Sequence, residues 1–165
     1  MSEELTENQE LEVWKRILAS SADSDIKMNS EEEIIELVQG VISNQLKQSV
    51  FCKALSRFAS NRRTLRTISL ISNRDYSAAR RLAAMLLSRN RNLQFAFAEN
   101  PERPIEYYRS SLRDAWRNEV SLTAQCTSAS EGTEDVPLIQ ALLGAARWHA
   151  ENAIELKRLF EQGPN

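Results

Sequence analysis

Glycine and proline are scarce in this 165-residue chain, which has only four of each. Because few residues form turns, the chain favours a small number of long helices over many short strands. Alanine, leucine, arginine and glutamate are abundant, and all four have good helix propensity. The length suits one domain that can bury a substantial core. The sequence therefore predicts a single all-α domain.

The chain also lacks segments that direct a protein into or across a membrane. It has no run of about 18 apolar residues, and its acidic N-terminus has no basic stretch followed by an apolar one. The two cysteines, Cys52 and Cys126, lie far apart without a CxxC spacing, which is typical of reduced core thiols rather than of a disulfide. We therefore expect a cytoplasmic protein with no membrane partner.

Motifs of the common catalytic chemistries are absent as well. The chain has no glycine-rich phosphate loop, no nucleophile elbow and no Ser/His/Asp set with a supporting spacing. Its single histidine falls within an apolar stripe, so general-base catalysis has few candidates. The sequence therefore predicts no catalytic residue, no organic cofactor and no small-molecule substrate.

Capping signals and loop residues divide the chain into four long helices. Ser30 followed by Glu33 is a capping box, and Asn61 can cap the second helix. Pro104 and Pro137 suit the first turns of the third and fourth helices. The expected helices are 30–59, 61–88, 104 to the polar run SASEGTED at 128–135, and 137 to just before Gly163.

Each long helix carries an apolar stripe that polar residues interrupt near its middle. The interruptions are Asn44 and Gln48 in the first helix, Asp75 in the second, Glu119 in the third and His149 in the fourth. Midpoints of similar helices share a layer in an antiparallel bundle, so we expect these side chains to converge. A buried carboxylate without a partner costs several kcal/mol, so Asp75 and Glu119 need donors, protons or a metal ion.

Two interpretations of the convergent residues remain open. The first is a satisfied polar cluster of Asn44, Asp75, Glu119 and His149 that fixes the register of the helices. The second is a metal site built from oxygen and imidazole ligands.

Four stretches resemble the helices of ferritin-like and rubrerythrin-like proteins. That family carries one glutamate on each of two helices and Glu-x-x-His on each of the other two. The stretches are SNQLKQSVFCKALSRFA at 43–59, NRDYSAARRLAAML at 73–86, LRDAWRNEVSLTA at 112–124 and AARWHAENAIELKRL at 145–159. The resemblance implies an antiparallel four-helix bundle of the ferritin-like type.

The same resemblance implies a degenerate di-metal site. The residues at the six ligand positions are Asn44, Asp75, Ala78, Glu119, Ala146 and His149. Only Glu119 and His149 match the family, and the two alanines offer no ligand atom. Two carboxylates remain of the roughly four that balance two iron ions, so oxygen activation is not expected. One Fe, Mn or Zn ion on Asp75, Glu119 and His149, with Asn44 as a neutral oxygen ligand, is the alternative.

Charges of opposite sign are separated along the chain. Residues 1–36 have a net charge of −8, whereas the arginine-rich residues 61–92 have a net charge of +7. Such blocks can steer a partner or hold the acidic arm on the basic helix, and they can equally be solvated faces. The arginines could also bind nucleic-acid phosphates, although aromatic residues do not alternate with them.

We therefore expect an acidic N-terminal arm, residues 1–30, with a short amphipathic helix at 7–20, followed by the bundle at 31–163. The expected function is non-catalytic: an assembly or interaction module that associates with itself or with another protein. The alternatives are a metalloprotein with one residual site, as a divergent oxidoreductase, and a weak nucleic-acid binder.

Overall fold

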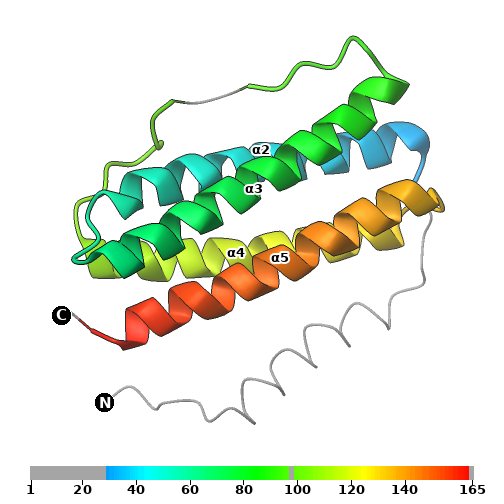
Figure 1. Ribbon diagram of the computed structural model, residues 1–165. Helices are drawn as coiled ribbons and strands as arrows, with labels where there is room; N and C mark the ends of the chain where they lie inside the picture. The colour runs from blue at the N-terminus through cyan, green and yellow to red at the C-terminus, as the bar shows by residue number, and fades with distance from the viewer. Residues whose placement is uncertain (1–28, 97–98, 164–165) are drawn as a thin grey trace, which may run out of the picture.

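The computed structural model describes residues 29–96 and 99–163, which form four helices packed against one another and, within these ranges, no strand (Figure 1). The helices are α2 (Glu31–Ser56), α3 (Arg62–Arg89), α4 (Tyr108–Glu131) and α5 (Val136–Glu161). The prediction of an all-α bundle is confirmed, whereas the short helix expected at 7–20 lies outside the described residues. None of the described helices is long and apolar enough to cross a membrane.

Side-chain caps fix the start of three helices, and the sequence predicts two of them, at Ser30 and Asn61. Ser30 Oγ accepts the backbone N–H of Glu33 at 3.2 Å, and Glu33 Oε2 accepts the backbone N–H of Ser30 at 2.9 Å. The side chains of Asn61 and Asp135 each accept a backbone N–H three residues further on, at 2.9 and 3.0 Å. Each such cap stabilises its helix by about 1 kcal/mol, because it satisfies an N–H that has no partner within the helix.

The start of α4, the third helix of the bundle, lies four residues after Pro104, where the sequence predicts it. A proline suits the first turn of a helix, but it suits an extended connection equally well. The residue before α4, Tyr107, has an extended backbone (φ −129°, ψ 117°) and makes no capping bond with its side chain. Without a Ser, Thr, Asn or Asp at this position, the sequence gives no signal for where the helix begins.

The four helices form two hairpins that pack side by side. α2 contacts α3 and α4, and α5 contacts α3 and α4. A short link joins α2 to α3 and another joins α4 to α5, whereas the described parts of the connection from α3 to α4, 90–96 and 99–107, lie along the bundle (Figure 1). As a result α3 and α4 point in the same direction, and the four helix pairs with the most contacts are all antiparallel. This arrangement brings the middles of all four helices into one layer.

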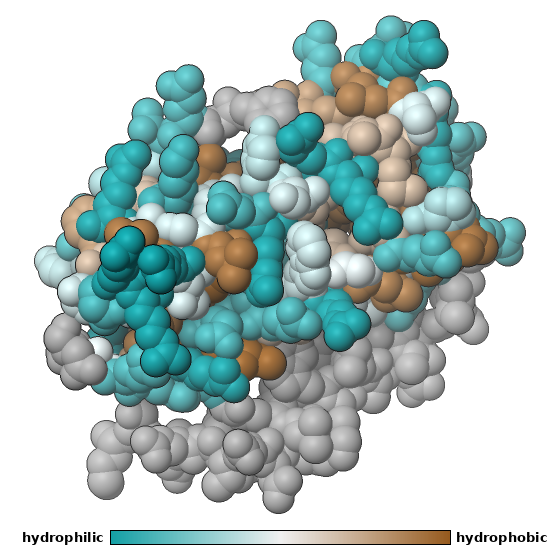
Figure 2. All heavy atoms as spheres, viewed as in Figure 1, coloured by the Kyte–Doolittle hydropathy of each residue, from teal (hydrophilic) through white to brown (hydrophobic). Residues whose placement is uncertain are grey.

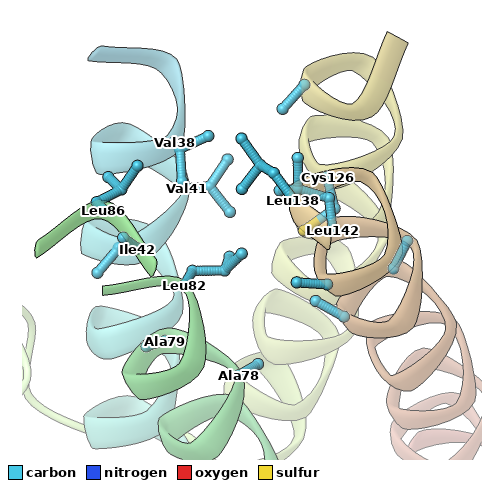
Figure 3. Packing of buried hydrophobic residues seen from close by; sticks show 14 of the residues in the cluster. Val38, Val41, Ile42, Ala78, Ala79, Leu82, Leu86, Cys126, Leu138 and Leu142 are labelled. Atoms are coloured by element: carbon cyan, nitrogen blue, oxygen red, sulfur yellow. The ribbon is translucent and has the colours of Figure 1, made fainter. Parts of the chain in front are cut away.

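Two apolar clusters fill the bundle on either side of that layer. Figure 3 shows the first, in which α2, α3 and α5 contribute side chains such as Val38, Ile42, Leu82, Leu86 and Leu142. The buried members of the second cluster are Cys52, Leu55, Ile68, Ile71, Leu112, Ala115 and Leu156. The polar residues of the middle layer are thus enclosed by hydrocarbon from both ends.

The buried faces of α3, α4 and α5 are those that the apolar stripes predict, apart from Leu65, which is 42% exposed. The stripe of α2 is buried at Val41, Gln48, Cys52 and Leu55, but at two other positions the buried residue is the next one along the chain. Leu37 and Asn44 are exposed, whereas the residues that follow them, Val38 and Gln45, are fully buried. One residue turns a helix by about 100°, so this displacement moves a side chain from the surface into the core. Each of these two pairs of neighbouring residues consists of two apolar residues or of two amides. The sequence pattern of α2 therefore does not decide which member of the pair is buried.

Candidate functional site

A polar layer crosses the middle of the bundle. Asp75 of α3, Glu119 of α4 and His149 of α5 meet there, each with 0% exposure. Gln45 and Gln48 of α2, which are 0% and 2% exposed, complete the layer. The structure therefore brings together three of the four residues that the sequence singles out as a site.

His149 contacts both carboxyl groups through a single ring nitrogen. Its Nδ1 lies 2.7 Å from Glu119 Oε2 and 3.3 Å from Asp75 Oδ1. The other ring nitrogen, Nε2, lies 3.0 Å from the amide nitrogen of Gln45. From its position on α5, the imidazole thus links α2, α3 and α4.

Amide side chains bind further oxygens of the layer. Gln48 Nε2 donates to Glu119 Oε1 at 3.0 Å, and its own Oε1 accepts from Asn118 Nδ2 at 3.0 Å. Asn152 Nδ2 donates to Asp75 Oδ1 at 3.1 Å. Both carboxyl groups therefore receive donors from a neutral amide as well as from the histidine.

Asn44 does not belong to the layer, contrary to the prediction. Its side chain is exposed and donates to Gln125 Oε1 at 2.8 Å. Gln45 takes the inner position instead, because it follows Asn44 on the helix and faces the core. The sequence analysis also missed Asn152, although its spacing of three residues from His149 places it on the same face of α5.

Burial and neighbouring groups change the protonation of the layer. Burial raises the pKa of Asp75 well above its usual value; the charge of Glu119 adds to the increase, and the hydrogen bond with His149 opposes it. Burial alone would lower the pKa of His149, but the hydrogen bond with Asp75 and the other acceptors around the ring raise it from 6.5 to about 11. Burial, together with the two nearby carboxyl groups, raises the pKa of the Cys52 thiol. At neutral pH, these contacts therefore favour the imidazolium form of His149.

A charged His149 also fixes the orientation of Gln45. Both nitrogens of an imidazolium donate, so Nε2 requires an acceptor. When the Gln45 amide turns over, its Oε1 becomes that acceptor, and this oxygen otherwise has no hydrogen-bond partner. Among the buried side chains that the structure describes, Asp75 Oδ2 is then the one oxygen left without a partner.

The layer contains a group of residues that could hold a metal ion. The ligand atoms of Cys52, Asp75 and Glu119 lie within 4.8 Å of one another, and all three residues are buried. The two alanines at the remaining ligand positions, Ala78 and Ala146, belong to the first apolar cluster. Figure 3 shows Ala78 on α3 among the hydrophobic side chains of that cluster. The group therefore suits one ion rather than two.

A surface groove reaches the layer from one side. It lies between α2, α4 and residues 100–107 of the connection, and its lining includes Gln48 and Asn118. Because Gln48 also donates to Glu119, this pair of hydrogen-bonded amides separates the buried carboxylate from the groove.

Comparisons of the chain with family models, with curated proteins and with solved structures find no match in any of the three. The resemblance to ferritin-like proteins therefore remains a prediction, and the function has to be argued from the polar layer and the surface.

Replacing Glu119 with glutamine should destabilise the protein by roughly 3–5 kcal/mol, because it leaves the buried imidazolium with one carboxyl group fewer. The new amide also places a donor against His149 Nδ1 or Gln48 Nε2, which are donors themselves. Urea unfolding followed by circular dichroism measures the change. Glu131→Gln, at the exposed end of the same helix, is the matched control and should stay within about 0.5 kcal/mol. Equal effects of the two variants would contradict the role given to the layer.

Stability should decrease as the pH rises above 6.5, because the folded state holds a proton on His149 more tightly than the unfolded state does. With a pKa raised from 6.5 to about 11, this contribution is complete below pH 6.5 and is lost as the pH approaches 11. The raised pKa of Asp75 acts in the same direction, since protonation there also favours the folded state. Urea unfolding at neutral and alkaline pH tests this, and His149→Gln should give a flatter profile. A wild-type stability that rises over this range would show that the imidazole is not charged.

Proposed function

We propose that the protein is a non-catalytic, ferritin-like helical bundle in which an internal network of polar side chains takes the place of a di-metal centre, and that it acts as an interaction module. One observation carries the proposal: the Nδ1 of His149 already lies within 3.3 Å of both carboxyl groups. A protonated ring at this position supplies the positive charge that metal ions supply in a working di-metal site.

The connectivity of the helices supports ferritin-like descent. Ferritin-like bundles have one long crossover connection, and here α3 and α4 point in the same direction, with the described residues 90–96 and 99–107 of their connection lying along the bundle (Figure 1). The two missing ligands are replaced by Ala78 and Ala146, whose methyl groups continue the apolar cluster. Replacing only one of these alanines with a ligand residue would place a polar side chain in the apolar cluster without the second ligand.

The closed interior supports a non-catalytic role. A catalytic group has to come within hydrogen-bonding distance of its substrate. Asp75, Glu119 and His149 are each 0% exposed, and amides from α2 and α4 lie between Glu119 and the surface groove. The polar layer therefore serves to stabilise the fold. Contacts with other molecules would be made by the surface.

The outer face of α3 is the surface that we propose for this contact. Asp75, which is buried, is the only acidic residue of the helix. The exposed arginines of α3 are Arg62, Arg63, Arg66, Arg80 and Arg81. Figure 2 shows mostly hydrophilic residues on the side of the bundle that α3 and α5 form, with hydrophobic residues in separate groups between them. We propose that the partner is a second copy of the chain, whose first 36 residues carry a net charge of −8.

A second candidate function, a bundle with a single Fe, Mn or Zn ion, is favoured by a different observation. Asp75 Oδ2 is buried without a hydrogen-bond partner, and it belongs to the Cys52–Asp75–Glu119 group. An unpaired polar atom in the interior is costly unless something binds it.

Loading with two iron ions should fail, because two of the six ligand positions are alanine and a third, Asn44, points to solvent. Elemental analysis after incubation with Fe(II) in air should show well under two irons per chain. A stoichiometry near two, with the absorption of an oxo-bridged pair, would overturn the non-catalytic proposal.

Neutralising two arginines of α3 should weaken self-association. Sedimentation of the full chain at low salt should show a dimer that Arg62→Gln/Arg66→Gln weakens about tenfold, as expected when about 1.4 kcal/mol of interaction is lost. Arg113→Gln/Arg117→Gln on α4, two exposed arginines with the same spacing, is the matched control and should leave the dimer intact. A wild-type protein that stays monomeric, or equal weakening by both pairs, would contradict this surface.

A further inference from the structure

We propose that Cys52, Asp75 and Glu119 bind one thiophilic divalent ion, such as Zn(II), through the sulfur and one oxygen of each carboxylate. This inference rests on the second proposed function, the single-ion site. It replaces the ligands expected from sequence, an imidazole and a neutral amide, with a thiolate. It also assigns the ion a structural role inside the bundle.

The geometry brings these ligands together from three helices. Cys52 lies on α2, Asp75 on α3 and Glu119 on α4, and their ligand atoms lie within 4.8 Å of one another. All three side chains are fully buried, so no bulk water competes for them. A small contraction around an ion would bring the three atoms to bonding distance.

One oxygen of each carboxyl group is not in contact with the histidine. Asp75 Oδ2 has no hydrogen-bond partner. Glu119 Oε1 shares one donor with Cys52, because Gln48 Nε2 lies 3.0 Å from this oxygen and 3.4 Å from Cys52 Sγ. An amide N–H already places partial positive charge between the sulfur and the carboxylate, which is what a cation would do there.

The other two oxygens are held by the histidine. His149 Nδ1 contacts Asp75 Oδ1 and Glu119 Oε2, and Asn152 also donates to Asp75 Oδ1. Hydrogen bonds of this kind orient ligands around a metal and are a regular part of metal sites. We therefore assign His149 as a positioning residue that presents the two carboxylates to the ion.

The chemistry of the ligands selects the class of ion. Binding of the ion displaces the proton of the Cys52 thiol to solvent. The resulting thiolate and the two carboxylates carry a charge of −3, which one divalent ion and a protonated His149 would neutralise, whereas two divalent ions would leave an excess of positive charge. Thiolate is a soft ligand that suits Zn(II) and Co(II), and Mg(II) prefers oxygen alone. Because the site is enclosed and ligands from three helices converge on it, the ion would add to the stability of the bundle.

The groove between α2 and α4 provides a path to the site. Gln48 and Asn118 line it and are hydrogen-bonded to each other, and Gln48 also contacts Cys52 and Glu119. This amide pair is what separates the groove from the thiol and the carboxylate, so it marks the route by which an ion would enter.

Titration of the reduced, full-length protein with Co(II) tests the assignment, because a cobalt–thiolate bond gives a charge-transfer absorption that oxygen and nitrogen ligands do not give. We expect this absorption to saturate at one ion per chain, to disappear when Zn(II) is added and to persist when Mg(II) is added. Cys52→Ser should abolish the absorption and weaken binding at least tenfold. Cys126→Ser is the matched control, since Cys126 is also a free and fully buried thiol, and it should keep the absorption.

The results separate the assignment from the function on which it rests. Stoichiometric Co(II) binding without the thiolate absorption, or an absorption lost in Cys126→Ser and kept in Cys52→Ser, would overturn the Cys52 assignment and leave a single-ion site standing. No bound Co(II) at all would overturn both. Zn(II) should also raise the melting temperature of the wild type and of Cys126→Ser, but not that of Cys52→Ser; an equal rise in all three would count against the proposal.

Discussion

Two carboxyl groups buried in the middle of a helical bundle are the constraint on which the rest of the structure depends. Hydrocarbon encloses them at both ends, so Asp75 and Glu119 must find their partners within one layer. Those partners come from the other helices, through His149 of α5 and Gln48 of α2. Sliding any helix by one turn would break these bonds and place an apolar side chain against a charge. The polar layer therefore fixes the register of the bundle. Contacts between leucine and alanine side chains are similar in alternative registers, so they distinguish the correct one less well.

This constraint also explains why the layer needs positive charge or protons of its own. In a di-metal bundle the carboxylates are neutralised by cations, so a chain without the cations has to supply positive charge or protons itself. Here burial raises the pKa of Asp75, and the surrounding acceptors raise that of His149. Both shifts favour the protonated forms, which reduces the negative charge of the layer. Ala78 and Ala146 belong to the apolar cluster on one side of this layer.

Sequence patterns predict most of the fold because the signals are local. The caps at Ser30 and Asn61 each require only a few adjacent residues, and both are confirmed. The α4 start was missed because Tyr107 offers no capping side chain. Of the site, Asp75, Glu119 and His149 could be found as polar residues in apolar stripes. Gln45 could not be preferred over Asn44, since both are short amides and only packing against the other helices decides which one is buried. The grouping of Cys52 with the carboxyl groups depends likewise on the tertiary arrangement of three helices.

The polar layer has two chemically different sides, and each is next to a thiol. Cys126 belongs to the first apolar cluster and lies 3.9 Å from the Gln45 amide, which in turn contacts the imidazole. Cys52 belongs to the second cluster and lies beside the carboxyl groups. A positively charged ring repels a cation near the first thiol, whereas the carboxyl oxygens attract one near the second. Two buried cysteines that are alike in exposure therefore differ in their electrostatic surroundings, and this difference makes only one of them a suitable metal ligand.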